Sequence, residues 1–252
     1  MKKLQSLKKP LRFSLLLLPV VAVATVLSVL YQFDLYDQAT IDLLLEQMGS
    51  VELVLAISVV QSVLYGFFAS FFGYILAEKL GLLRPFGFEK KALWVTLALA
   101  AVAGVVLGAD PWTFGAAIPA LQDVSAAVTP IAVIAAILYG GIVEELLLRL
   151  FVLSLLAWLL WKVFFRKRET VPTGALIAAN VIAALLFAAG HLPATVTAFG
   201  ELTPLLLFRC FLLNGGFGLV FGWLYRKHGI QYSMVCHAGA HIVSKLIWIL
   251  FI

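Results

Sequence analysis

Charged residues are scarce in this chain of 252 residues: 12% are charged and 63% are hydrophobic. A soluble domain carries about 25% charged residues, so the composition excludes an ordinary soluble fold. Cysteine is also rare, and Cys210 and Cys236 both lie in apolar runs, which favours two buried thiols over a disulfide. There is no C-x-x-C or Cys-rich metal-binding spacing. The net charge of +5 follows the expected membrane topology, so we predict no nucleic-acid partner.

The hydrophobic runs have the length of membrane-spanning helices. A helix needs about 20 apolar residues to cross a bilayer, whereas barrel strands are short and alternate in polarity. We therefore predict an all-α polytopic transmembrane helical bundle of about seven spans, within a single membrane domain of residues 1–252. Residues 1–127 would form three N-terminal spans and residues 128–252 a four-span core. The predicted spans are 13–33, 52–76, 92–108, 128–150 with a helical extension towards 165, 173–198, 204–225 and 230–251.

The charges between the spans alternate in sign. The first, third and fifth connections (34–51, 109–127 and 199–203) contain acidic residues and no Lys or Arg, whereas the N-terminal tail and the alternate connections are basic. The positive-inside rule then places the N-terminus in the cytoplasm and the C-terminus outside. The basic tail resembles the start of a signal peptide, but the apolar run continues to about Tyr31 without a small-x-small cleavage site. We therefore expect the first span to be retained.

Three charges interrupt the apolar run from about 129 to 165. They are Glu144, Glu145 and Arg149. A lone charge at the centre of a bilayer costs roughly 3 kcal/mol, and such residues usually mark a functional site. Glu145 and Arg149 are four residues apart and can pair on one helix face. Glu144 is left without that partner, which makes it the better candidate for chemistry.

Three histidines accompany the glutamates. His191 lies within the fifth predicted span, and His237 and His241 lie four residues apart on one helix face. If spans four and five form a hairpin, Glu144 lies 24 residues before Arg168 and His191 lies 23 residues after it, so both reach similar depth.

His237 is only about eight residues from the turn near 227–229, about 12 Å along a helix. It reaches the depth of Glu144 and His191 only if the hairpin of spans four and five protrudes beyond the membrane surface. Glu and His at one place can activate water, stabilise an oxyanion or bind a metal. A zinc site would need three protein ligands, which Glu144, His191, His237 and His241 can supply. The sequence lacks the H-E-x-x-H motif, because Ala238 stands at the position of its glutamate.

These residues together resemble the CPBP family, the intramembrane proteases related to type II CAAX prenyl endopeptidases, with bacterial abortive-infection and bacteriocin-immunity members. The resemblance covers about 129–245 and does not extend to the first three spans. It lies in the order, spacing and membrane setting of three motifs: Glu144-Glu145-x-x-x-Arg149, Phe187-x-x-x-His191, and His237 followed four residues later by His241.

The resemblance implies a role for each residue. Glu144 would be the general base on water, supported by Glu145, and Arg149 would orient the glutamates or meet a substrate carboxylate. His191 and His237 would hold the water, a divalent metal such as zinc, or the oxyanion. The family's last motif usually ends in Asn, so His241 departs from the pattern, and this raises the expectation of a metal.

The predicted function is therefore an intramembrane endopeptidase, a metalloprotease or a glutamate-dependent one, in the cell membrane of a prokaryote. Its partners would be the lipid bilayer and a membrane-associated peptide or protein substrate, such as a prenylated CAAX tail. Two other classes stay open: a non-catalytic scaffold or bacteriocin-immunity protein, and an ion-coupled transporter. The charged residues could also form a structural network. Outside this group, Arg209 and Lys245 are expected to extend towards the membrane interface.

Overall fold

The structure, a computed structural model, describes residues 2–252, with side chains from residue 7 onward. Lys2 and Lys3 of the predicted basic tail lie outside the described side chains. The described chain is helical and has no strands. It contains seven helical segments that are long and apolar enough to cross a membrane, which confirms the predicted fold class. These segments are Leu7–Leu35, Val51–Lys79, Lys90–Gly108, Pro130–Phe164, Thr173–Phe199, Pro204–His228 and Ile230–Phe251.

The helices divide into an N-terminal group and a C-terminal group. The first comprises α1 (Lys2–Leu35), α2 (Gln38–Met48), α3 (Val51–Lys79), α4 (Lys90–Gly108), α5 (Asp110–Thr113) and α6 (Ala120–Ala126). The second comprises α7 (Pro130–Ala135), the π-helical segments η1 (Ala136–Glu144) and η2 (Leu146–Leu153), α8 (Ser154–Phe164), α9 (Thr173–Gly190), α10 (Leu192–Phe199), α11 (Pro204–Cys210), the π-helical η3 (Phe211–Gly215), α12 (Gly216–His228) and α13 (Ile230–Phe251). The short helices α2, α5 and α6 lie in stretches that the sequence analysis treated as connections.

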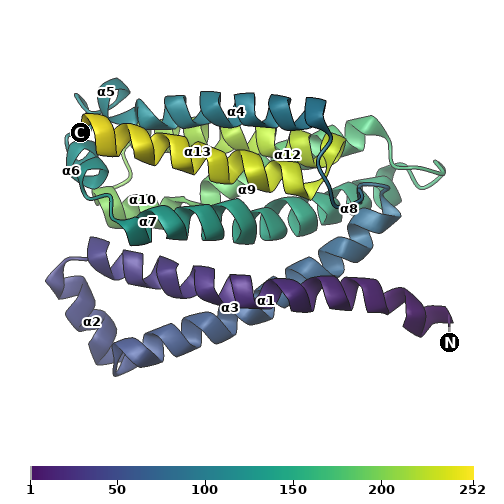
Figure 1. The fold of residues 1–252 in the computed structure, drawn as a ribbon, viewed down its shortest axis with the longest axis horizontal. Helices are drawn as coiled ribbons and strands as arrows, with labels where there is room; N and C mark the ends of the chain where they lie inside the picture. The colour runs from purple at the N-terminus through teal and green to yellow at the C-terminus, as the bar shows by residue number, and fades with distance from the viewer. Residues whose placement is uncertain (1) are drawn as a thin grey trace.

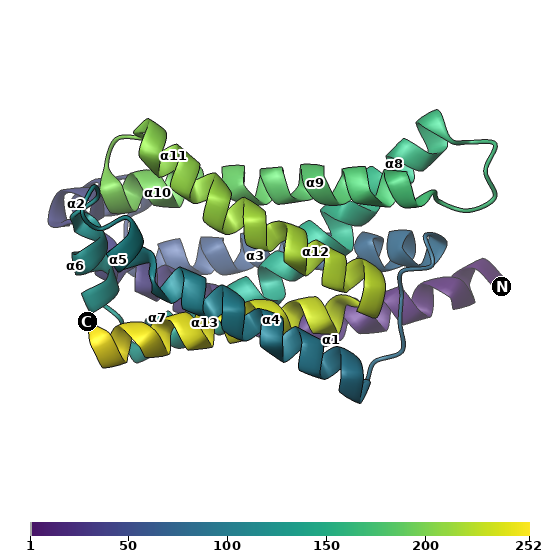
Figure 2. The ribbon, with the colours of Figure 1, turned by 90° about the horizontal axis from the view of Figure 1, so that it is seen from above.

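The connections gather at two ends of the bundle. The N-terminus and the α3–α4, α8–α9 and α12–α13 connections lie at one end, which we call the basic end (Figure 1). The corner around α2, the short helices α5 and α6, and the C-terminus lie at the opposite, acidic end (Figure 2). The α8–α9 turn extends well past the α12–α13 turn, as the depth argument required (Figures 1 and 2).

The first three spans surround the C-terminal core unevenly. Helices α1 and α3 cross and then diverge towards α2 (Figure 1). Helix α3 also packs on η2, and α1 packs on α7 and η1, whereas α4 lies along α13. The π-helical segments are therefore enclosed by α1 and α3 on one side and by α9, α12 and α13 on the other.

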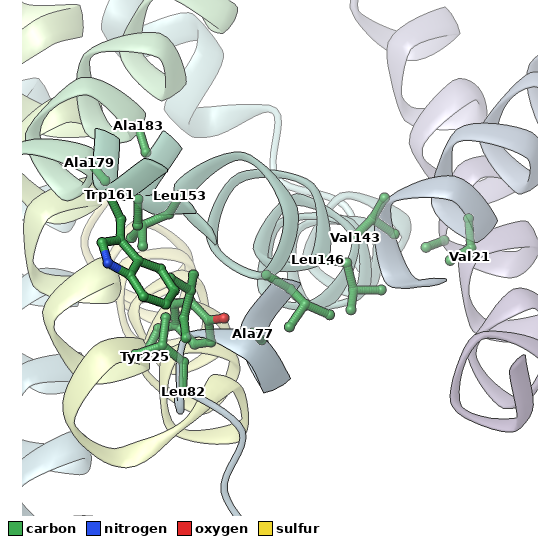
Figure 3. Packing of buried hydrophobic residues seen from close by; sticks show 14 residues of the cluster. Val21, Ala77, Leu82, Val143, Leu146, Leu153, Trp161, Ala179, Ala183 and Tyr225 are labelled. Atoms are coloured by element: carbon green, nitrogen blue, oxygen red, sulfur yellow. The ribbon is translucent and has the colours of Figure 1, made fainter. Parts of the chain in front are cut away.

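One apolar cluster joins both groups of helices. Val21 of α1 and Ala77 of α3 are completely buried, as are Val143 and Leu146 around the glutamates. Trp161 of α8, with Ala179 and Ala183 of α9, continues the same cluster (Figure 3). Because apolar side chains from several helices are buried together in this cluster, the helix that carries Glu144 and Glu145 is held between its neighbours.

The helix that carries the glutamates is wound unusually. Residues Ala136–Glu144 and Leu146–Leu153 form π-helical turns, which are rare and frequently occur at functional sites. Gly141 allows α13 to approach, because a Cβ placed there would lie 2.7 Å from the Cβ of Ala238. The close contact between η1 and α13 brings the glutamates to the histidines of the last span.

At the acidic end, Arg209 forms an ion pair with a partner that the sequence did not indicate. Its Nε lies 2.9 Å and 3.0 Å from the two carboxylate oxygens of Asp110, and its Nη2 also contacts Asp110 Oδ2. Asp110 is itself buried, so this pair is enclosed at the end of α4. Lys245 instead places its Nζ 3.9 Å from the ring centroid of Trp248.

We expect Arg209→Met to lower the free energy of unfolding by about 3 kcal/mol, because it leaves the buried Asp110 carboxylate without its partner. Thermal unfolding in detergent would measure the loss. The double variant Asp110→Asn with Arg209→Met should recover much of it, since no unpaired charge remains. Equal stability of the Arg209→Met variant and the parent would contradict this account.

Candidate active site

Glu145 is the centre of a buried polar network. Its side chain has no solvent exposure, and its Oε1 lies 3.0 Å from Arg149 Nη1 and 2.8 Å from His237 Nδ1. The hydroxyl of Ser233 donates to the other carboxylate oxygen and also contacts the Phe221 carbonyl at 2.9 Å. The predicted i,i+4 pair of Glu145 and Arg149 is therefore confirmed, and the pair also holds an imidazole of α13.

Aromatic rings enclose the buried arginine and the imidazole. The guanidinium carbon of Arg149 lies 4.3 Å from the ring centroid of Phe187 and 5.3 Å from that of Phe221. Phe221 stacks on His237 with centroids 4.4 Å apart, and Phe187 meets His191 edge-on at 4.6 Å. Cation–π attraction of this kind is strongest where the cation is desolvated. Rigid rings thus fix the positions of Arg149 and both histidines.

Glu144 lies outside this network and faces the two histidines. One of its carboxylate oxygens is 3.9 Å from His191 Nε2, and the other is 3.9 Å from His237 Nε2. Its side chain is 20% exposed, whereas His237 is 6% exposed and His191, at the α9–α10 junction, is 31% exposed. The structure therefore brings Glu144, His191 and His237 together, and it leaves Glu144 accessible.

Hydrogen bonds assign the imidazole protons. His191 Nδ1 lies 2.8 Å from the Phe187 carbonyl oxygen, and His237 Nδ1 lies 2.8 Å from the Glu145 carboxylate. Both partners are acceptors only, so each Nδ1 carries a proton. In the neutral imidazole each Nε2 then presents a lone pair towards Glu144. Three acceptors converge on one small space, which favours a proton donor such as water between them.

His241 joins the group through His237. The two rings stack with centroids 4.9 Å apart and planes at 28°. A Cβ added to Gly140 would lie 2.7 Å from His241 Nε2 and 3.4 Å from His237 Nε2, so both nitrogens point to the same part of η1. The lack of a side chain at Gly140 makes room for both imidazoles beside the glutamates.

The predicted metal ligands do not form a ligand cluster. Tetrahedral zinc, with O and N donors at about 2.0–2.1 Å, places neighbouring donor atoms about 3.3 Å apart. One Glu144 oxygen is 3.9 Å from His191 Nε2 and the other is 3.9 Å from His237 Nε2. No three His, Cys, Asp or Glu side chains in the described part of the chain have the geometry to hold a metal ion. We therefore derive the chemistry from the side chains alone.

Comparison with known families concerns the same part of the chain. The family model "Type II CAAX prenyl endopeptidase Rce1-like" matches residues 126–243, which contain all the residues described above. Residues 126–243 are thus similar to the Rce1-like family. The predicted family resemblance is confirmed, and the matching family model is named for a CAAX prenyl endopeptidase. No curated protein and no solved structure matches the chain.

All six predicted site residues lie within the matched region. Glu144, Glu145 and Arg149 lie on η1 and η2 or at their junction. His237 and His241 lie on α13, and His191 lies at the start of α10. Sequence analysis missed Ser233 and Phe221. Ser233 lies one helical turn before His237, so its i,i+4 spacing was a signal that could have indicated it. Phe221 gave no comparable signal, because its contact with His237 depends on how α12 packs against α13.

Proposed function

We propose that the chain is an intramembrane endopeptidase in which Glu144 activates water to hydrolyse a peptide bond. The observation that supports this proposal is the convergence of the Glu144 carboxylate with the Nε2 atoms of His191 and His237, each at 3.9 Å. The gap is too long for a direct hydrogen bond. It suits a water molecule that bridges the carboxylate and an imidazole.

The distances define how such a water would lie. A water about 2.8 Å from both Glu144 and His191 Nε2 would see them about 90° apart, close to the angle between its own two protons. It would donate one proton to each acceptor, and its lone pair would face outward. Glu144 takes up a proton as the water oxygen attacks the peptide carbonyl, and the protonated carboxyl then delivers it to the leaving amine.

The buried network would orient the oxyanion side of the site. Glu145 holds the Nδ1 proton of His237, and Arg149 fixes Glu145, so both are positioning residues. The bond from Nδ1 to Glu145 holds the His237 ring so that its Nε2 faces the reacting peptide. His241, stacked on His237, would provide a donor to the developing oxyanion.

The proposed substrate is a membrane-associated peptide, with a prenylated CAAX tail as the class that the family name suggests. The proposed setting is the cell membrane of a prokaryote, with the basic end in the cytoplasm. The charge bias of the connections supports this orientation, since basic connections favour the cytoplasmic side.

Hydrolysis by purified protein tests the proposal. The protein in lipid nanodiscs would be incubated with prenylated and unmodified CAAX peptides, and the products identified by mass spectrometry. We expect a new carboxyl terminus that carries one oxygen from labelled water. Binding of these peptides without any cleavage would instead support a scaffold, and ion flux in proteoliposomes without cleavage would support a transporter.

We expect the hydrolytic activity to resist chelation. A mechanism based on Glu144 and imidazoles needs no metal, so prolonged treatment with a zinc chelator should leave kcat unchanged. Metal analysis of the same sample by mass spectrometry serves as the control for complete removal. Loss of activity that returns on addition of zinc would contradict the glutamate mechanism and would assign Glu144, His191, His237 and His241 as candidate ligands.

His241→Asn should retain activity within about tenfold of the parent, because an amide also offers a hydrogen-bond donor at this position. His241→Leu removes the donor and should reduce kcat by about 10²-fold, the usual effect of losing one oxyanion donor. Equal kcat values for the parent and His241→Leu would exclude His241 from the oxyanion site.

A further inference from the structure

The N-terminal spans contain a polar cavity that the proposed reaction does not use. The cavity has a volume of about 210 Å³ and lies between α1, α3 and η1. Eight of its nine lining residues carry a hydroxyl or amide group. They are Thr25, Ser28, Gln32, Ser58, Gln61, Ser62, Tyr65 and Tyr139, and Val29 is the ninth.

Such a lining is unusual on helices that cross a membrane. A hydroxyl or amide transferred to an apolar medium without a partner costs roughly 2–7 kcal/mol. The same helices present large apolar side chains elsewhere, including Val60 and Leu64, which are 60% and 66% exposed. The face that lines the cavity is therefore much more polar than the face that carries Val60 and Leu64, and lipid chains are poor solvents for it.

The cavity runs from the acidic end of the bundle to its middle. Gln32 lies three residues before the end of α1 at Leu35, or about 5 Å, and Thr25 lies ten residues before it, or about 15 Å. On α3, Tyr65 lies 14 residues after Val51, or about 21 Å. Since the hydrocarbon core is about 30 Å thick, the inner end of the cavity reaches mid-membrane depth.

At its inner end the cavity meets the helix of the active site. The hydroxyls of Ser62 and Tyr65 lie 2.7 Å apart, and those of Tyr65 and Tyr139 lie 2.9 Å apart. Tyr139 and Glu144 belong to the same π-helical segment, five residues apart, which is the spacing that a π-helical hydrogen bond connects. A chain of hydroxyls thus links the cavity wall to the segment that carries the proposed base.

We propose that this cavity is a water-filled recess, entered from the acidic end between α1 and α3, that brings water to within about one helical turn of Glu144. Helices α1 and α3, which line the cavity, diverge towards α2 on that side (Figure 1). Its use as a source of hydrolytic water rests on the proposed function, whereas its hydration does not.

Cysteine labelling tests the hydration directly. Ser28→Cys, Ser58→Cys and Gln61→Cys would each be introduced into the full chain with Cys210 and Cys236 replaced by Ala. Val60→Cys and Leu64→Cys are the matched controls, because they lie on α3 at the same depth and are exposed outside the cavity lining. A charged, membrane-impermeant thiol reagent would be applied to either face of sealed proteoliposomes of known orientation. Labelling after denaturation confirms that each thiol is intact.

We expect the cavity positions to react about tenfold faster than the controls, because the reactive thiolate forms in water and is suppressed in apolar surroundings. The fast reaction should require reagent on the acidic side. Equal rates at cavity and control positions would overturn the hydrated recess, and fast labelling from the basic side alone would overturn its direction. Neither result depends on peptidase activity, so failure of this proposal and failure of the proposed function are distinguishable.

Discussion

Glu144→Gln is expected to reduce kcat for peptide hydrolysis by about 10²–10⁴-fold, the usual contribution of a general base. The amide keeps the shape of the side chain but cannot accept the proton of the attacking water. Glu144 is not part of the buried ion pair, and its side chain is 20% exposed, so the substitution should leave the fold intact. Rates measured under single-turnover conditions separate this effect from substrate binding and product release.

The matched control for this variant is Glu201→Gln, which makes the same chemical change at an exposed position outside the site. Its kcat should equal that of the parent. Both variants should unfold at the parent temperature in detergent. Full activity of Glu144→Gln would refute Glu144 as the base, and a large loss of stability in that variant would show that Glu144 has a structural role.

The spans and the central motif were predictable because both depend on short-range patterns. Apolar runs of membrane-crossing length fixed the seven segments, and the i,i+4 spacing fixed the pair of Glu145 and Arg149. The same reasoning separated Glu144 from Arg149, since neighbouring residues on a helix point in different directions. Charge cost within a bilayer then selected these residues as the functional candidates.

Features that depend on packing between distant segments were not predictable. The partner of Arg209 is Asp110, 99 residues away, and the position of Asp110 depends on the short helix α5. The π-helical winding of η1 and η2 has no clear periodic signal in an apolar run. The serine and glutamine residues of α1 and α3 lie around one cavity only because the two helices cross, and this crossing has no signal in the sequence.

Arg149→Met is expected to lower the free energy of unfolding by about 3–5 kcal/mol, because it leaves the fully buried Glu145 carboxylate without its cationic partner. Methionine keeps much of the volume between the rings of Phe187 and Phe221, so lost packing should contribute less than the unpaired charge. Thermal and denaturant unfolding in detergent would measure the change.

The double variant Glu145→Gln with Arg149→Met separates the two functions of this pair. It contains no unpaired charge, so most of the lost stability should return. Activity should not return, because a neutral amide accepts a weaker hydrogen bond from His237 Nδ1 than a carboxylate does and so positions the imidazole less firmly. Recovery of both stability and kcat would show that the pair only supports the fold. Recovery of stability alone would show that the buried charges, although they touch no substrate, position the imidazole that does.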